Sequence, residues 1–199
     1  YMEPRVCVVD SDARGNLTVW SSTQHLFGLR EKLAFALGIP VGKVKVVKPP
    51  YIGGGFGGKL DLGYIEPIAA MLSMKTGKPV RIEHTRAEDF ISTARHPIKM
   101  YLKTGLKKDG TFTARYARSI LDTGAHATHG AEVIMVHGLY GFFFPYRCPN
   151  RTWEGFTVYT NNMIGGGYRG YGAPQACFAV ESQLDETRRR ATHGVVGEV

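Results

Sequence analysis

The stretch Ile52-Gly53-Gly54-Gly55-Phe56-Gly57-Gly58-Lys59 places five glycines in six consecutive positions. Glycine loses more backbone freedom on folding than any other residue, so such a run needs a structural reason. The candidate reasons are close approach of the backbone to a ligand, positive φ angles, or disorder. Disorder is disfavoured, because residues 44–47 predict a strand before the run and residues 65–74 predict a helix after it. We therefore expect residues 53–59, the first glycine loop, to be held at both ends.

Upstream of this loop the sequence predicts a β-hairpin. Two short apolar runs at residues 6–10 and 17–20 read as strands. Between them, Gly15-Asn16 supplies the positive φ angles that a tight hairpin turn requires.

A helix is expected directly after the hairpin. Hydroxyl side chains at residues 21–23 can cap its first turn, and its apolar stripe extends from about His25 to Leu37. Gly38 follows as a C-terminal cap. Gln24 is thereby placed at a strand-to-helix junction.

Downstream of the loop, the pattern is a helix over residues 61–75, a turn at Gly77-Lys78-Pro79 and a strand over 80–84. A longer hairpin follows, with strands at 98–106 and 111–119 around an Asp109-Gly110 turn.

The last part of the chain repeats the order of strand, glycine-rich loop and helix. Residues 124–146 fit neither the helical nor the strand period and are expected to be irregular with at most one helix. A strand at 153–160 leads to the second glycine loop, residues 165–172, and then to a helix over 173–190 with Pro174 in its first turn. The elements predict an α+β fold with mixed sheets and helices.

Composition narrows the possible environments and partners. The 199 residues are 43% hydrophobic, enough for one sizeable core or two smaller ones. The net charge of +8 is spread along the chain, which favours an anionic ligand or an acidic partner and argues against nucleic acid. Cys7, Cys148 and Cys177 form no disulfide or zinc pattern, so we expect a reducing, cytoplasmic location.

The ends of the sequence suggest a piece of a longer protein. The chain begins without an initiator Met and closes with Val195 to Val199 after a basic run. No apolar run approaches the roughly 20 residues that a membrane-spanning helix needs, so no membrane association is expected.

Two general motifs partly match the first glycine loop. Gly53, Gly55 and Gly58 have the spacing of a dinucleotide-binding fingerprint, and Glu83 follows at the end of the next strand, somewhat late for a ribose-binding acid. A phosphate-binding P-loop would need a hydroxyl after Lys59 to hold Mg²⁺. Leu60 stands there instead, which disfavours nucleotide hydrolysis.

Several motifs in a fixed order are more specific than either pattern. Together they resemble the molybdenum-binding subunit of the xanthine dehydrogenase and aldehyde oxidase family, and the resemblance covers the chain until it weakens after Glu186. The motifs are Met2-Glu3-Pro4, the stretch from Val19 to Gln24, the first glycine loop, Tyr168-Arg169-Gly170-Tyr171-Gly172-Ala173-Pro174-Gln175, and the stretch from Ala179 to Glu186.

The resemblance implies an oxidoreductase. Such enzymes hydroxylate an aldehyde or a carbon beside a ring nitrogen, with water as the oxygen source and a molybdenum–molybdopterin cofactor as the electron acceptor. The cofactor, in its simple or its dinucleotide form, presents anionic phosphate and a flat pterin that glycine-loop amides can approach closely. The two glycine loops are then expected to face a shared cofactor cleft. Residues 1–199 would be the molybdopterin-binding domain, the first half of the family's molybdenum-binding region, truncated after about residue 190.

The resemblance assigns roles around the first loop. Gln24 would donate a side-chain hydrogen bond to a ligand of the metal; the alternative is an amide satisfied locally at a helix end. Phe56 and Gly57 would place backbone amides near the metal's ligands, or Phe56 would only plug the loop. Gly54, Gly55 and Gly58 complete this cofactor-binding set.

Around the second loop, Arg169 would stabilise negative charge as the substrate is oxidised, with Gly170 beside it; the alternative is a structural ion pair. Tyr171 aligns with an aromatic residue that stacks on ring substrates, although it could equally be packing. His137 falls in a variable substrate-pocket region, with a core or surface position as the first alternative.

Departures from the family pattern narrow the substrate. Xanthine-specific relatives carry glutamate at the position of Leu60, so purines are disfavoured. Carbon monoxide dehydrogenases carry a copper-binding cysteine at the position of Gly170. An aldehyde, an N-heterocycle such as a nicotinate-like ring, or an aromatic thioester remains.

The resemblance also implies what lies outside the chain. The family's catalytic glutamate belongs to a second half of the subunit, and Gly197-Glu198-Val199 is only superficially similar to its context. We therefore expect the isolated chain to be inactive. The expected partners are that second half, an iron–sulfur subunit, since no cysteine cluster is present here, and an FAD subunit. The alternatives are a non-catalytic truncated domain with a structural role and a dinucleotide-binding dehydrogenase domain.

Overall fold

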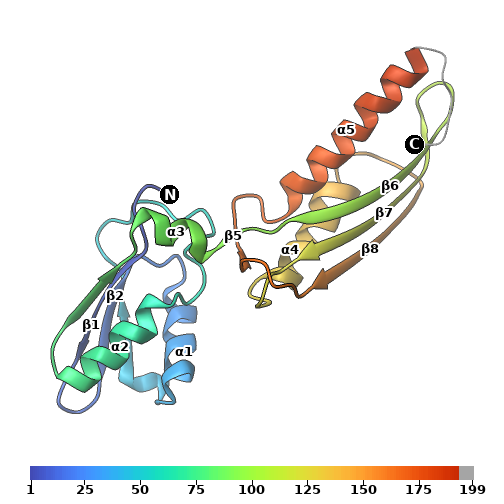
Figure 1. Cartoon of the computed structure of the whole chain (residues 1–199). Coiled ribbons are helices and arrows are strands. Elements are labelled where there is room, and N and C mark those ends of the chain that lie inside the picture. The colour runs from blue at the N-terminus through green and yellow to red at the C-terminus, as the bar shows by residue number, and fades with distance from the viewer. Residues whose placement is uncertain (193–199) are drawn as a thin grey trace. The chain divides into compact units, whose positions relative to one another are not determined.

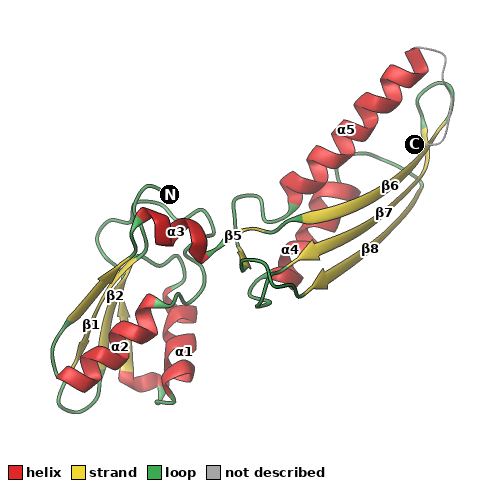
Figure 2. Ribbon diagram, in the orientation of Figure 1, coloured by secondary structure: helices red, strands yellow, loops and turns green. Residues whose placement is uncertain are grey.

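The computed structural model describes residues 1–192 and divides into two compact units, with the second beginning at Arg95 (Figure 1). Gly197-Glu198-Val199 lies outside the described residues. Both units combine a mixed sheet with helices, so the predicted α+β class is confirmed (Figure 2). No helix among residues 1–192 has the length and apolarity that crossing a bilayer requires.

The first unit is a four-stranded sheet with the order β3-β2-β1-β4 and with helices α1 and α2 packed against it. Strand β1 is antiparallel to β2 and to β4, whereas β2 and β3 are parallel. The elements are β1 (Val6–Ser11), β2 (Leu17–Ser21), α1 (Leu26–Leu37), the short 3₁₀ helix η1 (Val41–Lys43), β3 (Val44–Val47), α2 (Ile65–Thr76), β4 (Val80–Glu83) and α3 (Arg86–Ser92).

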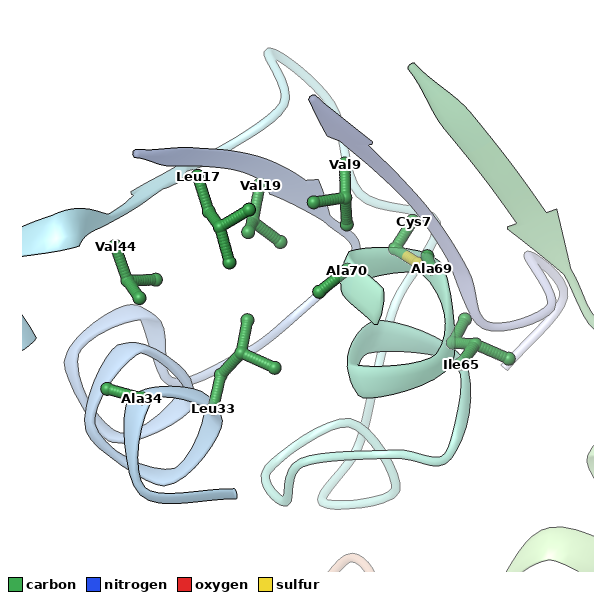
Figure 3. Close-up of a cluster of buried hydrophobic side chains, with 10 residues drawn as sticks. All are labelled: Cys7, Val9, Leu17, Val19, Leu33, Ala34, Val44, Ile65, Ala69 and Ala70. Carbon is green, nitrogen blue, oxygen red and sulfur yellow. The ribbon is translucent and has the colours of Figure 1, made fainter. Parts of the chain in front are cut away.

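The core of this unit lies between the sheet and the two helices (Figure 3). Val9 and Val19 point from the strands towards Leu33 of α1 and Ala69 of α2, and all four are buried. At about 25 cal/mol per Å² of apolar surface removed from water, this burial stabilises the arrangement of sheet and helices that carries the first glycine loop.

The N-terminal hairpin was predicted correctly, with two local differences. Gly15 has the expected positive φ of 74°, but Asn16 does not; it binds the carboxylate of Asp12 through its backbone and side-chain amides. Helix α1 ends at Gly38 in the left-handed conformation, as expected, but begins at Leu26 without a side-chain cap. Of the hydroxyls expected to cap it, Thr23 accepts the N–H of His25 just before the helix, whereas Ser22 accepts from Val6 and Ser21 donates to Glu66.

In the second unit, helices α4, η2 and α5 cover one face of the sheet β6-β7-β8. β6 and β7 form the predicted antiparallel hairpin, and β8 pairs parallel to β7. The elements are β5 (Ala94–Arg95), which pairs with β9 (Gly165–Gly166), β6 (Ile98–Leu106), β7 (Phe112–Asp122), α4 (Gly130–Val136), the π-helix η2 (His137–Phe143), β8 (Asn150–Val158) and α5 (Ala173–Thr192).

Residues 130–143 are more regular than the sequence predicted, since α4 continues directly into η2. Glycines interrupt the helical pattern here because neighbouring groups leave no space for a side chain. A Cβ on Gly138 would lie 2.7 Å from the Trp153 ring, and one on Gly141 would lie 2.1 Å from the Cβ of Ala176.

Candidate cofactor-binding site

The first glycine loop lies against side chains of its own unit, and this contact explains most of its glycines. A Cβ on Gly53 would lie 2.3 Å from the Cβ of Glu3, one on Gly55 would lie 2.4 Å from Oε1 of Gln24, and one on Gly58 would lie 2.6 Å from the Tyr1 ring. Gly54 and Gly57 have φ angles of 87° and 99°, which glycine adopts without strain.

Phe56, at the tip of this loop, also has a positive φ, of 50°. Its side chain is about half exposed. A non-glycine residue in this conformation carries strain of order 1–3 kcal/mol, and such residues cluster at ligand-binding sites. At Phe56 the first glycine loop is therefore held in a backbone conformation that a non-glycine residue does not favour.

Gln24 joins the strand-to-helix junction to the loop. Its Oε1 accepts hydrogen bonds from the backbone N–H of Gly57 at 2.8 Å and of Lys59 at 3.2 Å. The backbone N–H of Gln24 donates to the Lys59 carbonyl. Two N–H donors identify this side-chain atom as the oxygen, so the amide nitrogen is the other atom. That NH₂ group makes no hydrogen bond to any described residue and is available as a donor.

Lys59, which ends the loop, is fully buried and turned inward. Its Nζ lies 2.7 Å from Oε2 of Glu3 and 4.7 Å from the centre of the Tyr1 ring. The same Glu3 oxygen accepts the N–H of Gly53 at 2.9 Å. Partial burial would raise the pKa of the Glu3 carboxyl, but the hydrogen bonds from Lys59 and Gly53 outweigh it and lower that pKa. Because Lys59 is engaged within the protein, a P-loop function has no lysine to bind phosphate.

The residues after the loop are held by a buried ion pair that the sequence did not reveal. Arg5 donates to the carbonyls of Gly58 at 2.6 Å and Asp61 at 2.9 Å, and it lies 3.9 Å from the carboxylate of Glu66. Glu66 in turn accepts from Gly63. No local pattern marks the pairing of Arg5 with Glu66, because the two residues are far apart in the sequence.

The sheet beside the loop also excludes a dinucleotide fold. A dinucleotide-binding domain has a doubly wound parallel sheet, whereas here β1 is antiparallel to both of its neighbours. Glu83, the candidate ribose ligand, forms an ion pair with Arg81 on exposed β4. The dinucleotide interpretation is therefore wrong.

In the second unit, Arg95 holds the second glycine loop through its backbone. Its guanidinium donates to the Arg169 carbonyl at 2.8 Å and to Oε1 of Gln175 at 3.0 Å, and it lies 4.4 Å from the centre of the Tyr168 ring. The loop backbone is left-handed at three successive residues, with φ of 86° at Gly170, 50° at Tyr171 and 96° at Gly172. Arg169 is exposed at this turn.

Two of the predicted substrate residues near this loop have structural contacts. The Tyr171 hydroxyl binds Nδ1 of His129, and its ring is partly buried beside Leu121. His137 is fully buried: Nε2 lies 3.0 Å from the Ser119 hydroxyl and Nδ1 lies 3.0 Å from the Gly172 carbonyl, while burial lowers its pKa. A core position of His137 is therefore favoured. Its hydrogen bond to the Gly172 carbonyl holds the second glycine loop.

Comparison with known proteins identifies the family of the chain that carries these two loops. The family model for the molybdopterin cofactor-binding domain matches residues 1–191. The chain belongs to this family.

Relatives of this molybdopterin cofactor-binding domain are much longer than the chain. It is 42% identical over 188 residues to a probable xanthine dehydrogenase subunit from Bacillus subtilis, and the match covers 93% of the chain and 25% of that protein. It is 40% identical over 189 residues to the nicotinate dehydrogenase large molybdopterin subunit of Eubacterium barkeri, covering 93% of the chain and 43% of that protein. The chain thus spans less than half the length of these relatives.

A solved structure agrees on the fold. The aldehyde oxidoreductase from Desulfovibrio gigas superposes with a TM-score of 0.86 at 28% identity, over 95% of this chain and 21% of that one. The family inferred from the sequence motifs is confirmed. A shared cleft between the two glycine loops stays a prediction.

Proposed function

We propose that this domain is the molybdopterin-binding part of a molybdenum hydroxylase that oxidises an aldehyde or an N-heteroaromatic or aromatic substrate, with water as the oxygen source. One observation supports this most directly. The oxygen of the Gln24 amide is fixed by two loop N–H groups, so its NH₂ group is held as a donor beside the first glycine loop.

The residues present fit such a cofactor. When bound, the molybdenum centre would accept the two electrons that the substrate gives up. Gln24 would donate from its amide nitrogen to an oxygen or sulfur ligand of the metal, which the locked orientation of its oxygen permits. The backbone of Gly54 to Gly58, with no side chains other than Phe56, would allow close approach of the flat pterin and its phosphate.

The second loop would serve the substrate. Arg169, beside Gly170, would stabilise negative charge that develops during oxidation, because a guanidinium stays charged at all relevant pH values. Tyr171 would present its ring to an aromatic substrate, and Leu60 would supply an apolar contact where purine-specific relatives carry glutamate. His137 would act on the site through the Gly172 carbonyl instead of touching the substrate.

Partners must complete the enzyme in this proposal. The chain spans 25% of one relative and 43% of another, so the remaining polypeptide would supply the catalytic glutamate. An iron–sulfur subunit and an FAD subunit would carry the electrons away. Three free cysteines, two of them buried, fit a reducing cytoplasm.

Metal analysis of the native complex tests the proposal. We expect close to one molybdenum atom per chain, together with a pterin released on denaturation, and we expect substitution of Gln24 by alanine to lower aldehyde or N-heterocycle oxidation. The alternative, a non-catalytic domain with a structural role, predicts a complex that contains the chain but no molybdenum. That result would refute the hydroxylase assignment.

A further inference from the structure

A cavity of about 600 Å³ opens in the second unit beside Phe112 and Arg151, where β7 and β8 begin. Figure 1 shows these two strands side by side. The volume of the cavity is typical of small-molecule sites. Aromatic rings of Phe112, Phe143, Phe144 and Tyr146 form its walls, and Arg147 and Arg151 lie among them. We call it the arginine cavity.

A third arginine lies behind the aromatic wall. Arg115 is only 2% exposed, and its guanidinium is 4.7 Å from the centre of Phe142, 5.5 Å from Phe112 and 5.7 Å from Tyr146. It donates one hydrogen bond, to the Phe142 carbonyl at 3.2 Å, and its buried Nε has no partner among the described residues. Buried charges in proteins are normally paired, so a lone buried guanidinium leaves a positive potential in need of an anion.

Positive charge around the cavity is not balanced by its lining. None of the residues that line it is acidic. Arg151 uses one nitrogen for the Phe143 carbonyl at 2.7 Å, and Arg147 makes no hydrogen bond or ion pair to any described residue. Glu181 accepts the Tyr146 hydroxyl at 2.8 Å, and its carboxylate attracts the Arg115 guanidinium, so this one negative charge offsets only part of the positive charge of the three arginines. Three like charges near one apolar cavity repel each other and strengthen its attraction for an anion.

From these contacts we infer that the arginine cavity binds a carboxylate attached to a flat apolar group. Planar guanidinium groups match carboxylates with paired hydrogen bonds, and the ring walls offer stacking surface. The cavity lies outside the two glycine loops, so this site is independent of the proposed cofactor chemistry. The ligand is a free aromatic acid, because no amino-acid side chain carries a carboxylate on an aromatic ring.

Titration of the 199-residue chain with benzoate tests the inference, followed by NMR shifts of the backbone amides at 143, 144, 146, 147 and 151. Benzoate should bind at these residues, while benzylamine, which has the ring but a positive charge, should not. Removing both cavity arginines with Arg147→Gln and Arg151→Gln should weaken benzoate binding about tenfold or more. Arg118→Gln, on the opposite face of the same sheet, removes one positive charge away from the cavity and should change the affinity less than twofold.

Two further measurements keep the test decisive. Arg151→Lys retains the charge but not the planar guanidinium, so its benzoate affinity should lie between those of the unchanged chain and of Arg151→Gln, which separates charge from hydrogen-bond geometry. The same titration on the longer protein should give the same binding; blocked binding there would overturn a site for a free aromatic acid. Benzylamine binding as tightly as benzoate, equal losses in Arg118→Gln and the double variant, or no benzoate shifts at the cavity would each overturn the inference.

Discussion

Individual glycines of the first loop are required by contacts within the protein, which separates their structural role from any role in binding. Gly55 is the clearest example, because Oε1 of Gln24 occupies the space that a Cβ would need. A side chain here would displace the amide that holds the N–H groups of Gly57 and Lys59. The packing of Gly55 therefore depends on Gln24, although the two residues lie far apart in the sequence.

Substitution Gly55→Ala should destabilise the first unit by about 1–3 kcal/mol, the usual cost of overpacking a filled site. Urea unfolding followed by Trp20 fluorescence measures the change. Gly42→Ala is the matched control, because nothing lies within 4 Å of its added Cβ, and it should be nearly neutral. Equal effects of the two substitutions would show that Gln24 yields easily and does not fix the loop.

Glu3 should make the stability of the same unit depend on pH. The hydrogen bonds from Lys59 and Gly53 lower the pKa of Glu3 below its ordinary value of 4.5, so the folded state binds this proton less readily than the unfolded state. The stabilisation is therefore complete above pH 4.5 and is lost as the pH falls through the lowered pKa.

Glu3→Gln should remove that contribution and leave a smaller slope of unfolding free energy against pH between about 5 and 3. At neutral pH the variant should also be less stable, because the buried Lys59 ammonium loses its charged partner. Glu31→Gln, on the exposed side of α1, is the control. An unchanged slope in Glu3→Gln would contradict the assignment of this acid response to Glu3.

At the scale of elements, short-range signals predicted most of the strands and helices. Gly15, Gly38 and the Asp109-Gly110 turn each mark a boundary through a local backbone requirement. The range 61–75 places the start of α2 four residues early, because residues 61–64 are held by Arg5, which precedes β1, and by Glu66 in the first turn of α2 itself. At most one helix was expected within residues 124–146, and the continuous helical run at 130–143 was not placed, since its glycines match the shapes of Trp153 and Ala176 instead of a periodic pattern.

The contact between η2 and α5 should be tested as a pair. Gly141→Ala places a methyl 2.1 Å from the Cβ of Ala176 and should cost about 1–3 kcal/mol of unfolding free energy. Ala176→Gly in the same chain removes the opposing methyl and should recover part of that loss, giving a coupling energy of at least about 0.5 kcal/mol in a double-mutant cycle. Thermal or urea unfolding of all four proteins supplies the cycle. If the two substitutions had strictly additive effects on the unfolding free energy, the methyl groups of residues 141 and 176 would not be in contact, and η2 and α5 would not be tightly packed there.

For the whole molecule, ordered motifs carried the prediction further than any single pattern. They predicted the family and the placement of Gln24 beside the first loop, because the order and spacing of motifs can be read from the sequence, whereas long-range contacts cannot. They could not predict that Lys59 turns inward, and they left open whether His137 lies in the core, at the surface or in the pocket, since both depend on side chains from other elements.

The outer face of α2 is apolar and exposed. Its inward residues pack in the core, yet Ile68, Met71 and Leu72 are 49%, 62% and 43% exposed. A helix that is apolar on both sides is typical of a protein interior, and large exposed apolar patches mark interaction sites. The relatives, of which the chain spans 25% and 43%, have the additional length to cover such a face.

We therefore expect the isolated chain to self-associate through α2, and Met71→Lys to reduce that association by placing a charge in the apolar face. Light scattering over a range of protein concentrations measures it. Ala131→Lys adds the same charge at an exposed position of α4 and should leave the association unchanged, because it lies outside the α2 face. If both substitutions reduce association equally, net charge alone controls it. If only Met71→Lys does, the apolar face of α2 is the contact through which the chain associates.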